Sequence, residues 1–194
     1  MFTQQITIYK LKTTKKMKKA ILILALATTT GSLFAQKKTT TSATVKFDAT
    51  TKLDAMPVAE NKTVVALIDS KTGSVAFEAQ IKGFNFGNPM MQEHFNGEKW
   101  MDSEKNPTST FKGKITNLGD VKFDKDGSYA AEIAGDLTMK GISKPLTGKA
   151  TIVVKAGAIS ATSDFTIKLA DYSISNAGGK LADEPKISVS ADFK

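Results

Sequence analysis

Alternation between apolar and polar residues is the feature that most constrains how this chain can fold. Every second residue from Val75 to Ile81 is apolar, and the residues between them are mostly polar. A period of two residues is the pattern of a β-strand that buries one face. The same pattern recurs over residues 111–115, 121–123, 129–133, 151–155, 165–169 and 187–193. The sequence therefore predicts an all-β domain whose strands share one apolar interior.

Turn-forming residues separate these runs. They lie at residues 71–73, 124–127, 140–145 and 156–157, and each group contains glycine beside a polar or small residue. The spacing predicts eight to ten short strands, roughly 10–15 residues apart, which is typical of a sandwich or an up-and-down barrel. Such short connections leave no room for the crossovers that parallel strands need. We therefore expect a single antiparallel domain with one core.

Residues 88–95 interrupt the alternation. Asn88 is a favourable N-cap and Pro89 a favourable first helical residue, so we predict a short helix here. Side chains three or four residues apart share one face of a helix. The residues grouped in this way are Met90, Met91, and His94 or Phe95.

The first 35 residues carry the three parts of a secretory signal peptide. A lysine-rich stretch ends at Lys19, an apolar stretch covers residues 20–27, and small or polar residues lead to a cleavage site after Ala35. Because the apolar stretch is far shorter than the roughly 20 residues that span a bilayer, we expect cleavage and export to a bacterial periplasm. Met17, which precedes its own lysine pair, is an alternative start of translation.

The remaining chain divides into a short lead-in and a domain. Residues 36–43 are rich in Lys, Thr and Ser, and we expect them to be flexible. We expect residues 44–194 to form the barrel.

The leader contains six lysines and no acidic residue, so the net charge of the chain without its leader is +2 instead of +8. The chain also contains no arginine, the side chain best suited to phosphate and base-edge contacts. We predict no nucleic-acid partner.

Catalytic motifs are absent from the sequence. Without cysteine, the chain has no disulfide, no thiolate nucleophile and no Cys-based metal site. It also has no P-loop, nucleotide-binding glycine motif, zinc-protease helix or nucleophile elbow. The candidate carboxylates sit mostly in expected turns, the usual place of solvated charges, and are Asp69, Glu93, Asp102, Glu104 and Asp171. We expect no enzyme activity, no metal and no cofactor.

The densest group of large apolar side chains runs from Phe84 to Phe111 and includes the only His and the only Trp. Met and Phe adapt well to irregular apolar partners, so this segment either lines a ligand cavity or closes one end of the barrel as ordinary core. Two further hypotheses make His94 a haem or metal ligand with a nearby methionine, or a general base. One His without Cys gives too few ligands for zinc or type-I copper, and we favour a structural His94 or one at the mouth of a pocket.

Several motifs stand in a characteristic order. They are Lys-Gly-Phe-Asn-Phe at 82–86, Met-Met-Gln-Glu-His-Phe-Asn at 90–96, Pro107, Thr-Phe-Lys-Gly-Lys-Ile at 110–115, Gly-Asp-Leu-Thr-Met-Lys-Gly-Ile-Ser-Lys-Pro-Leu at 135–146, and Phe-Thr-Ile-Lys-Leu-Ala-Asp-Tyr at 165–172. In this combination the chain resembles the YceI-like family of bacterial periplasmic proteins, also described as polyisoprenoid-binding. The resemblance covers roughly residues 44–194.

The resemblance implies a lipocalin-like antiparallel barrel of about eight strands with an elongated apolar channel. Proteins of this family bind isoprenoid chains or other long amphiphiles, and they have no agreed enzymatic activity. The residues that we expect to contact the ligand are Phe84, Phe86, Met90, Met91, His94, Phe95, Trp100, Phe111, Met139, Phe165, Ile167 and Tyr172. The residues that could orient a quinone or phosphate head are His94, Asn85, Asn88 or Tyr172.

The resulting hypothesis is a periplasmic carrier that holds a polyisoprenoid, an isoprenoid quinone or a fatty-acid-like amphiphile without catalysis. Two alternatives stay open. One is a structural or interaction barrel filled by its own side chains, and the other is a redox-associated haem or metal partner that uses His94. A transient membrane contact and a homodimer are both compatible with the carrier hypothesis.

Overall fold

The computed structural model describes residues 36–193 except residue 56, so the expected signal peptide and its cleavage site fall outside the described residues. The described part contains eight strands, one α-helix and three short 3₁₀-helices. The strands are β1 (Lys37–Asp48), β2 (Val58–Asp69), β3 (Ser74–Gln80), β4 (Thr108–Ile115), β5 (Gly127–Met139), β6 (Ile142–Lys155), β7 (Ala158–Thr166) and β8 (Lys186–Phe193). The helices are η1 (Ile81–Gly83), α2 (Pro89–Asn96), η2 (Leu118–Asp120) and η3 (Leu169–Tyr172).

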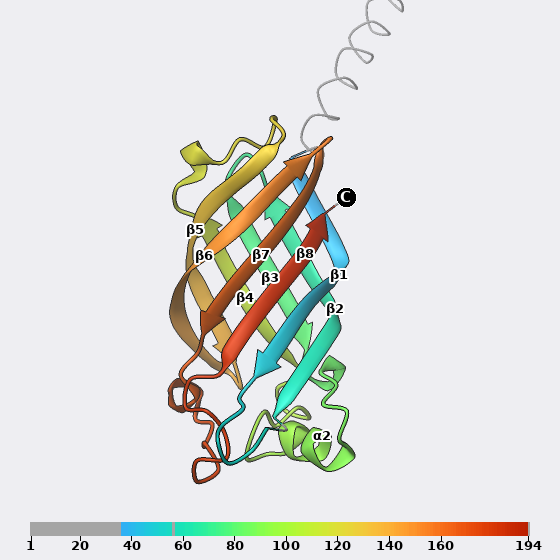
Figure 1. Cartoon of the computed structure of the whole chain (residues 1–194), viewed down its shortest axis with the longest axis vertical. Coiled ribbons are helices and arrows are strands. Elements are labelled where there is room, and N and C mark those ends of the chain that lie inside the picture. The colour runs from blue at the N-terminus through green and yellow to red at the C-terminus, as the bar shows by residue number, and fades with distance from the viewer. Residues whose placement is uncertain (1–35, 56, 194) are drawn as a thin grey trace, which may run out of the picture. The chain divides into compact units, whose positions relative to one another are not determined.

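The eight strands form one closed antiparallel barrel (Figure 1). Each strand pairs with its neighbours in sequence, and β1 pairs with β8 to close the ring. The predicted all-β fold, a single antiparallel barrel of about eight strands, is confirmed. Figure 1 shows α2 and the loop that follows β7 at one end, and the connection that contains η2 at the other. We call the first of these the α2 end.

The pleat of each strand separates an inner from an outer face. On β6, for example, Ala150, Ile152 and Val154 face inward and are 7%, 1% and 2% exposed, whereas Val153 between them is 38% exposed. Neighbouring side chains of a strand point to opposite faces, so the apolar set of every strand turns to the same interior. Burial of that set, worth about 25 cal/mol per Å², stabilises the barrel.

Two of the predicted turns are two-residue hairpin connections. Lys140 and Gly141 join β5 to β6 with φ angles of 49° and 74°. Ala156 and Gly157 join β6 to β7 with φ angles of 50° and 79°. Positive φ at both central residues is what the tightest hairpin turn requires, since its twist matches that of the flanking strands. The glycine in each pair adopts this conformation without a steric penalty.

The predicted helix at residues 88–95 is confirmed as α2. The side-chain oxygen of Asn88 accepts hydrogen bonds from the backbone N–H groups of Met90 (3.0 Å) and Met91 (3.1 Å), as expected of an N-cap. Pro89 occupies the first helical turn, where its missing N–H costs nothing. In the part of the chain that the structure describes, no helix is long and apolar enough to cross a membrane.

The strand predicted at residues 121–123 is wrong. These residues lie in the connection between β4 and β5, after η2, and the predicted turn at residues 124–127 ends this connection instead of making a tight hairpin. Val121 is buried and Phe123 half-buried, both against the core at this end of the barrel. Two apolar anchors under a loop happen to be two residues apart, and over so short a run they cannot be told from a strand.

The structure also differs from the expectation for residues 36–43. Strand β1 begins at Lys37, which is the partner of Asp69 on β2. Its side chains there are mostly polar and exposed or half-buried. Backbone pairing with β2 holds this tract in the sheet, and its last residue, Ala43, is fully buried. Composition gave no sign of this strand.

Candidate ligand cavity

An elongated cavity lies inside the barrel. Its volume, taken as the space open to the centre of a water molecule, is about 180 Å³, many times the 10–15 Å³ or so that one water needs. All eight strands contribute to its wall. Among the described residues, the wall is apolar except for Ser109, Thr110, Thr162 and Ser163, and it includes no charged side chain. Such a space favours apolar chains over water or ions.

The inner face is less buried at mid-barrel than near the ends. Phe77, Ile133 and Val189 all line the cavity and are only half-buried. Their apolar surface faces empty space instead of other side chains. Packed protein interiors leave few voids larger than a water molecule, so this barrel is not filled by its own side chains.

An aromatic cluster closes the α2 end. Phe95 of α2 is 5% exposed, and its ring centroid lies 4.8 Å from that of Phe86, 5.5 Å from Phe84 and 5.7 Å from Trp100. Phe47 of β1 contacts the same cluster, with centroid distances of 6.2 Å to Phe95 and 6.4 Å to Trp100. Offset and edge-on aromatic pairs at these distances are favourable. These rings are core and cavity wall at once, because all of them except Phe86 line the cavity.

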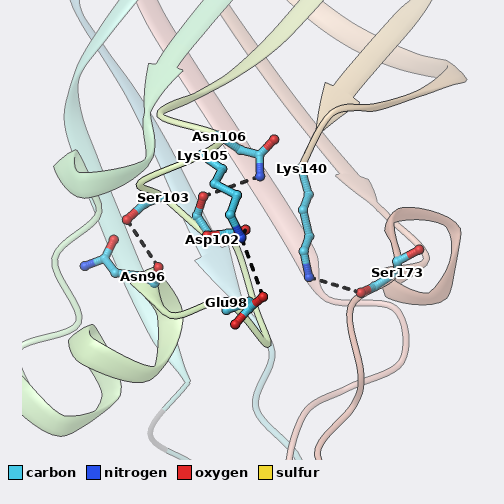
Figure 2. Close-up of polar contacts among 8 residues, drawn as sticks. All are labelled: Asn96, Glu98, Asp102, Ser103, Lys105, Asn106, Lys140 and Ser173. Carbon is cyan, nitrogen blue, oxygen red and sulfur yellow. Dashed lines mark hydrogen bonds and ion pairs between the residues drawn. The ribbon is translucent and has the colours of Figure 1, made fainter.

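The loop after α2 holds Trp100 in this cluster. Its backbone reverses at Asp102, which has a φ of 47°. Asp102 forms an ion pair with Lys105 (3.2 Å), and Lys105 also lies 3.5 Å from Glu98 (Figure 2). Hydrogen bonding and attraction to Asp102 raise the pKa of the Lys105 ammonium. Since Lys105 and Glu98 are largely exposed, these pairs add little stability, and the backbone hydrogen bonds of the loop determine its shape.

A second polar contact joins two loops at the same end. The Lys140 ammonium, in the turn between β5 and β6, donates a hydrogen bond to the backbone oxygen of Ser173 at 3.4 Å (Figure 2). Ser173 follows η3 and has a φ of 54°. Leu169 of η3 and Ile174 just beyond it are buried and line the cavity. This loop therefore closes the part of the α2 end that the aromatic cluster leaves uncovered.

Apolar packing also closes the opposite end. Phe193 of β8 and Ile68 of β2 are 1% and 2% exposed, and both belong to the core together with Val121 of the β4–β5 connection. A ligand that enters the cavity must therefore displace an end cluster or pass through the side of the barrel.

Seven of the twelve residues expected at a ligand site lie on the cavity wall: Phe84, Phe95, Trp100, Phe111, Met139, Phe165 and Ile167. The other five lie elsewhere. Phe86 is buried in the aromatic cluster, and Tyr172 is buried in η3, where burial raises the pKa of its hydroxyl. Met91 is half-buried against the core, whereas Met90 and His94 are exposed on α2. Ligand contact by any of the twelve stays a prediction.

The polar residues considered for a head group already have other partners or positions. Asn88 caps α2, and Asn85 accepts a hydrogen bond from the backbone of Gly87 at 2.8 Å. His94 lies on the exposed face of α2. Within the described residues, no three His, Cys, Asp or Glu side chains come together as metal ligands would.

Most residues of the cavity wall lie outside the Phe84–Phe111 segment that the sequence singled out. The additional apolar wall residues include Val45, Val64, Ile133, Leu137, Leu146 and Val189. Each occupies an inner position of a strand, so the alternation itself carried the signal. What it could not show is which inner positions face the cavity and which pack against each other.

Comparisons with known proteins agree on the fold. A family model described as YceI-like domain matches residues 27–193. A polyisoprenoid binding domain from Saccharophagus degradans, implicated in plant cell wall breakdown, superposes with a TM-score of 0.69 at 10% identity, over 82% of this chain and 98% of that chain. BcnA from Burkholderia cenocepacia superposes with a TM-score of 0.64 at 17% identity, over 78% and 96%. The Campylobacter jejuni YceI protein gives 0.52 at 21%, over 68% and 80%. No curated protein matches this chain.

Proposed function

This chain belongs to the YceI-like family, and from that membership and the apolar cavity of the barrel we propose that it binds one long apolar molecule. The single observation that carries the proposal is the cavity of about 180 Å³ with no charged side chain on its wall. A protein under no demand to bind would gain stability by filling this space, because cavities in a core are destabilising.

The chemistry of the wall favours a tail over a rigid polar ligand. Apolar contacts are worth about 25 cal/mol per Å² and have no preferred direction. The wall therefore accepts chains of different length and branching. Polyisoprenoids, the tails of isoprenoid quinones and fatty-acid-like chains all meet this requirement. The Saccharophagus degradans neighbour is described as a polyisoprenoid binding domain, which supports the isoprenoid class.

The predicted leader makes this a carrier outside the cytoplasm. A secretory signal over residues 1–35 would deliver the barrel to the periplasm, where a water-insoluble chain needs a protein to cross an aqueous compartment. Cell fractionation of the full chain, compared with a variant in which Lys15, Lys16, Lys18 and Lys19 are replaced by Gln, tests this part. Retention of both proteins in the cytoplasm would contradict it.

Extraction of the purified barrel with organic solvent, followed by mass spectrometry, tests the binding function directly. We expect an apolar chain in an amount close to one per protein. Gly148 faces inward on β6, and a Cβ placed there would meet no heavy atom within 4 Å. Gly148→Leu should therefore occupy the cavity and reduce the extracted ligand by at least about tenfold.

Thr147→Leu is the matched control, because Thr147 is the neighbouring residue on the outer face of β6 and is exposed. It adds a similar apolar side chain without entering the cavity, so its extracted ligand should equal that of the unaltered protein. Absence of any apolar molecule, together with failure of the purified barrel to bind an added isoprenoid alcohol, would overturn the proposed function.

A further inference from the structure

Strand β6 lacks a strand partner along half of one side. Its pairing with β5 runs the whole length, from Val154 to Ile142. Its pairing with β7 covers only the six residues from Ala150 to Lys155. Beyond Ser163, strand β7 pairs with β8 alone, and the two continue together through a hydrogen bond from the Ile167 N–H to the Pro185 oxygen. Residues 142–149 of β6 therefore form a free edge within the barrel.

The sequence of this edge explains why it is free. Pro145 has no N–H to donate, and proline is found in sheets on edges and not between two partners. Gly148 has no side chain to pack against a neighbouring strand. At the end of the pairing, the Ser163 hydroxyl donates a hydrogen bond to the backbone oxygen of Lys149 at 2.7 Å. The short helix η3, from the loop after β7, packs against β6.

Burial along the inner face of β6 changes at the same residue as the pairing does. Ala150 and Ile152, in the paired half, are 7% and 1% exposed. Leu146 and Gly148, in the unpaired half, are only half-buried although they line the cavity. The cavity thus extends to the free edge, where β6 has no strand beside it on the β7 side.

Two lysines lie at this edge, and Lys144 is the one at an inner position, whereas Lys149 is on the outer face as the partner of Glu132. Lys144 is the cross-strand partner of Leu137, which lines the cavity, so it occupies an inward position between Ile142 and Leu146. The alternation along β6 predicts an apolar residue at position 144. The residue at this position is a lysine, and it is exposed. Among residues 36–55 and 57–193, no hydrogen bond or ion pair is formed by the side chain of Lys144.

We propose that the cavity opens sideways between β6 and β7 and that Lys144 binds the anionic head of an amphiphile whose tail fills the barrel. The ligand class is a single apolar chain with a phosphate or carboxylate head. This inference rests on the proposed function and adds to it the place and the charge of the head group. An ammonium that donates to such an oxygen forms a charge-assisted hydrogen bond, roughly twice as strong as a neutral one. A head group in the opening also remains in contact with water, which avoids the cost of burying a charge.

The test compares two probes that share one tail, farnesyl phosphate and farnesol. Trp100 is the only tryptophan of the chain and lines the cavity, so its fluorescence reports occupancy. The unaltered protein should bind farnesyl phosphate about tenfold more tightly than farnesol, as one partly exposed charge-assisted hydrogen bond permits. Lys144→Gln should abolish this preference while farnesol affinity stays within about twofold.

Lys155→Gln is the matched control. Lys155 lies at the opposite end of the same strand, next to the turn and on the outer face, and the substitution changes the net charge by the same amount. It should preserve the preference for the phosphate. Raising the salt concentration should reduce that preference in the unaltered protein and in Lys155→Gln, and have no effect on Lys144→Gln.

Four results of these titrations would overturn the proposed head-group site. Equal affinity for both probes in the unaltered protein, or an unchanged preference in Lys144→Gln, would overturn the head-group site and leave the binding function intact. Binding of neither probe, with no apolar molecule recovered on extraction, would overturn the proposed function and this inference together. A preference lost equally in Lys155→Gln would show a general charge effect and also overturn the site.

Discussion

Gly113 on β4 and Gly135 on β5 are cross-strand partners on the inner face, and the ring of Phe111 covers both of them. A Cβ at Gly113 would lie 2.7 Å from the ring, and one at Gly135 would lie 2.8 Å from it. The two glycines thus let a large side chain lie flat against the wall. The ring of Phe111, which lines the cavity, therefore occupies the space that two ordinary side chains would fill.

We expect Gly135→Ala to destabilise the barrel and to narrow the cavity. The new Cβ would lie 2.5 Å from the Cα of Gly113, which cannot move without distorting the ladder. Overpacking of this kind costs about 1–3 kcal/mol. Denaturant unfolding measures the loss, and farnesol titration should show weaker binding. Gly119→Ala is the control, because Gly119 is exposed in η2, lies outside the cavity wall, and a Cβ there meets nothing within 4 Å; equal losses in the two variants would contradict the assignment.

Phe95→Ala should be among the most destabilising substitutions at the α2 end. The Phe95 side chain is 5% exposed and contacts the rings of Phe84, Phe86 and Trp100. Truncation of a buried Phe costs about 3–5 kcal/mol. Met90→Ala, on the same helix but 67% exposed, should change the free energy of unfolding by less than about 0.5 kcal/mol. Similar losses for both would show that α2 is not fixed through Phe95.

Asp69 makes the stability of the barrel depend on pH in the acidic range. Its carboxylate accepts hydrogen bonds from the backbone N–H groups of Thr72 (3.0 Å) and Lys71 (2.9 Å), and these lower the pKa of Asp69. Because the folded pKa is below the unfolded value of about 3.9, the carboxylate stabilises the folded state above that pH. Its contribution is lost as the pH falls through the folded pKa.

Asp69→Asn keeps the shape of the side chain and removes its charge. We expect it to lower the free energy of unfolding at pH 7 by about 1 kcal/mol, and the difference from the unaltered protein should shrink below pH 4 or so. Urea unfolding at several pH values measures this. A difference that is constant from pH 7 to the acidic limit would contradict the role of the charge. Asp192→Asn, at an exposed position of β8, is the control.

His94→Ala should leave ligand binding unchanged within about twofold. His94 is exposed on α2 and is not part of the cavity wall. Farnesol titration of both proteins tests this expectation, and metal analysis with a visible spectrum tests the redox alternative. A tenfold loss of affinity, or a metal or haem band that disappears in the variant, would restore His94 as a functional residue.

Much of the architecture follows from the sequence. The period-two runs around Phe77, Ile133 and Ile152 predict strands, and the Lys140-Gly141 and Ala156-Gly157 pairs predict the hairpins that join them. Asn88 and Pro89 predict the helix. Local patterns succeed here because pleat, turn geometry and capping each depend on a few neighbouring residues. They fail at Val121 and Phe123, where two anchors under a loop imitate a strand.

Local sequence patterns predicted only part of the candidate site. The aromatic motif correctly pointed to one end of the interior, but Leu146, Gly148 and Val189 belong to the same wall and come from strands far apart in sequence. Exposure of Met90 and His94 depends on how α2 rotates over the barrel. That rotation is determined by Phe95 packing against rings from other segments, which no local pattern contains.

By itself, the sequence determined that the strands have one apolar face and that the chain must close this face into a single interior, since alternation and turn chemistry are local properties. Only the tertiary structure decided that the interior is partly empty and that β6 has a free edge. Both depend on the register between strands and on the volume left by side chains that meet across the barrel. The lysine at position 144 shows the difference: the sequence gives its charge, and the pairing with Leu137 gives its place on the inner face.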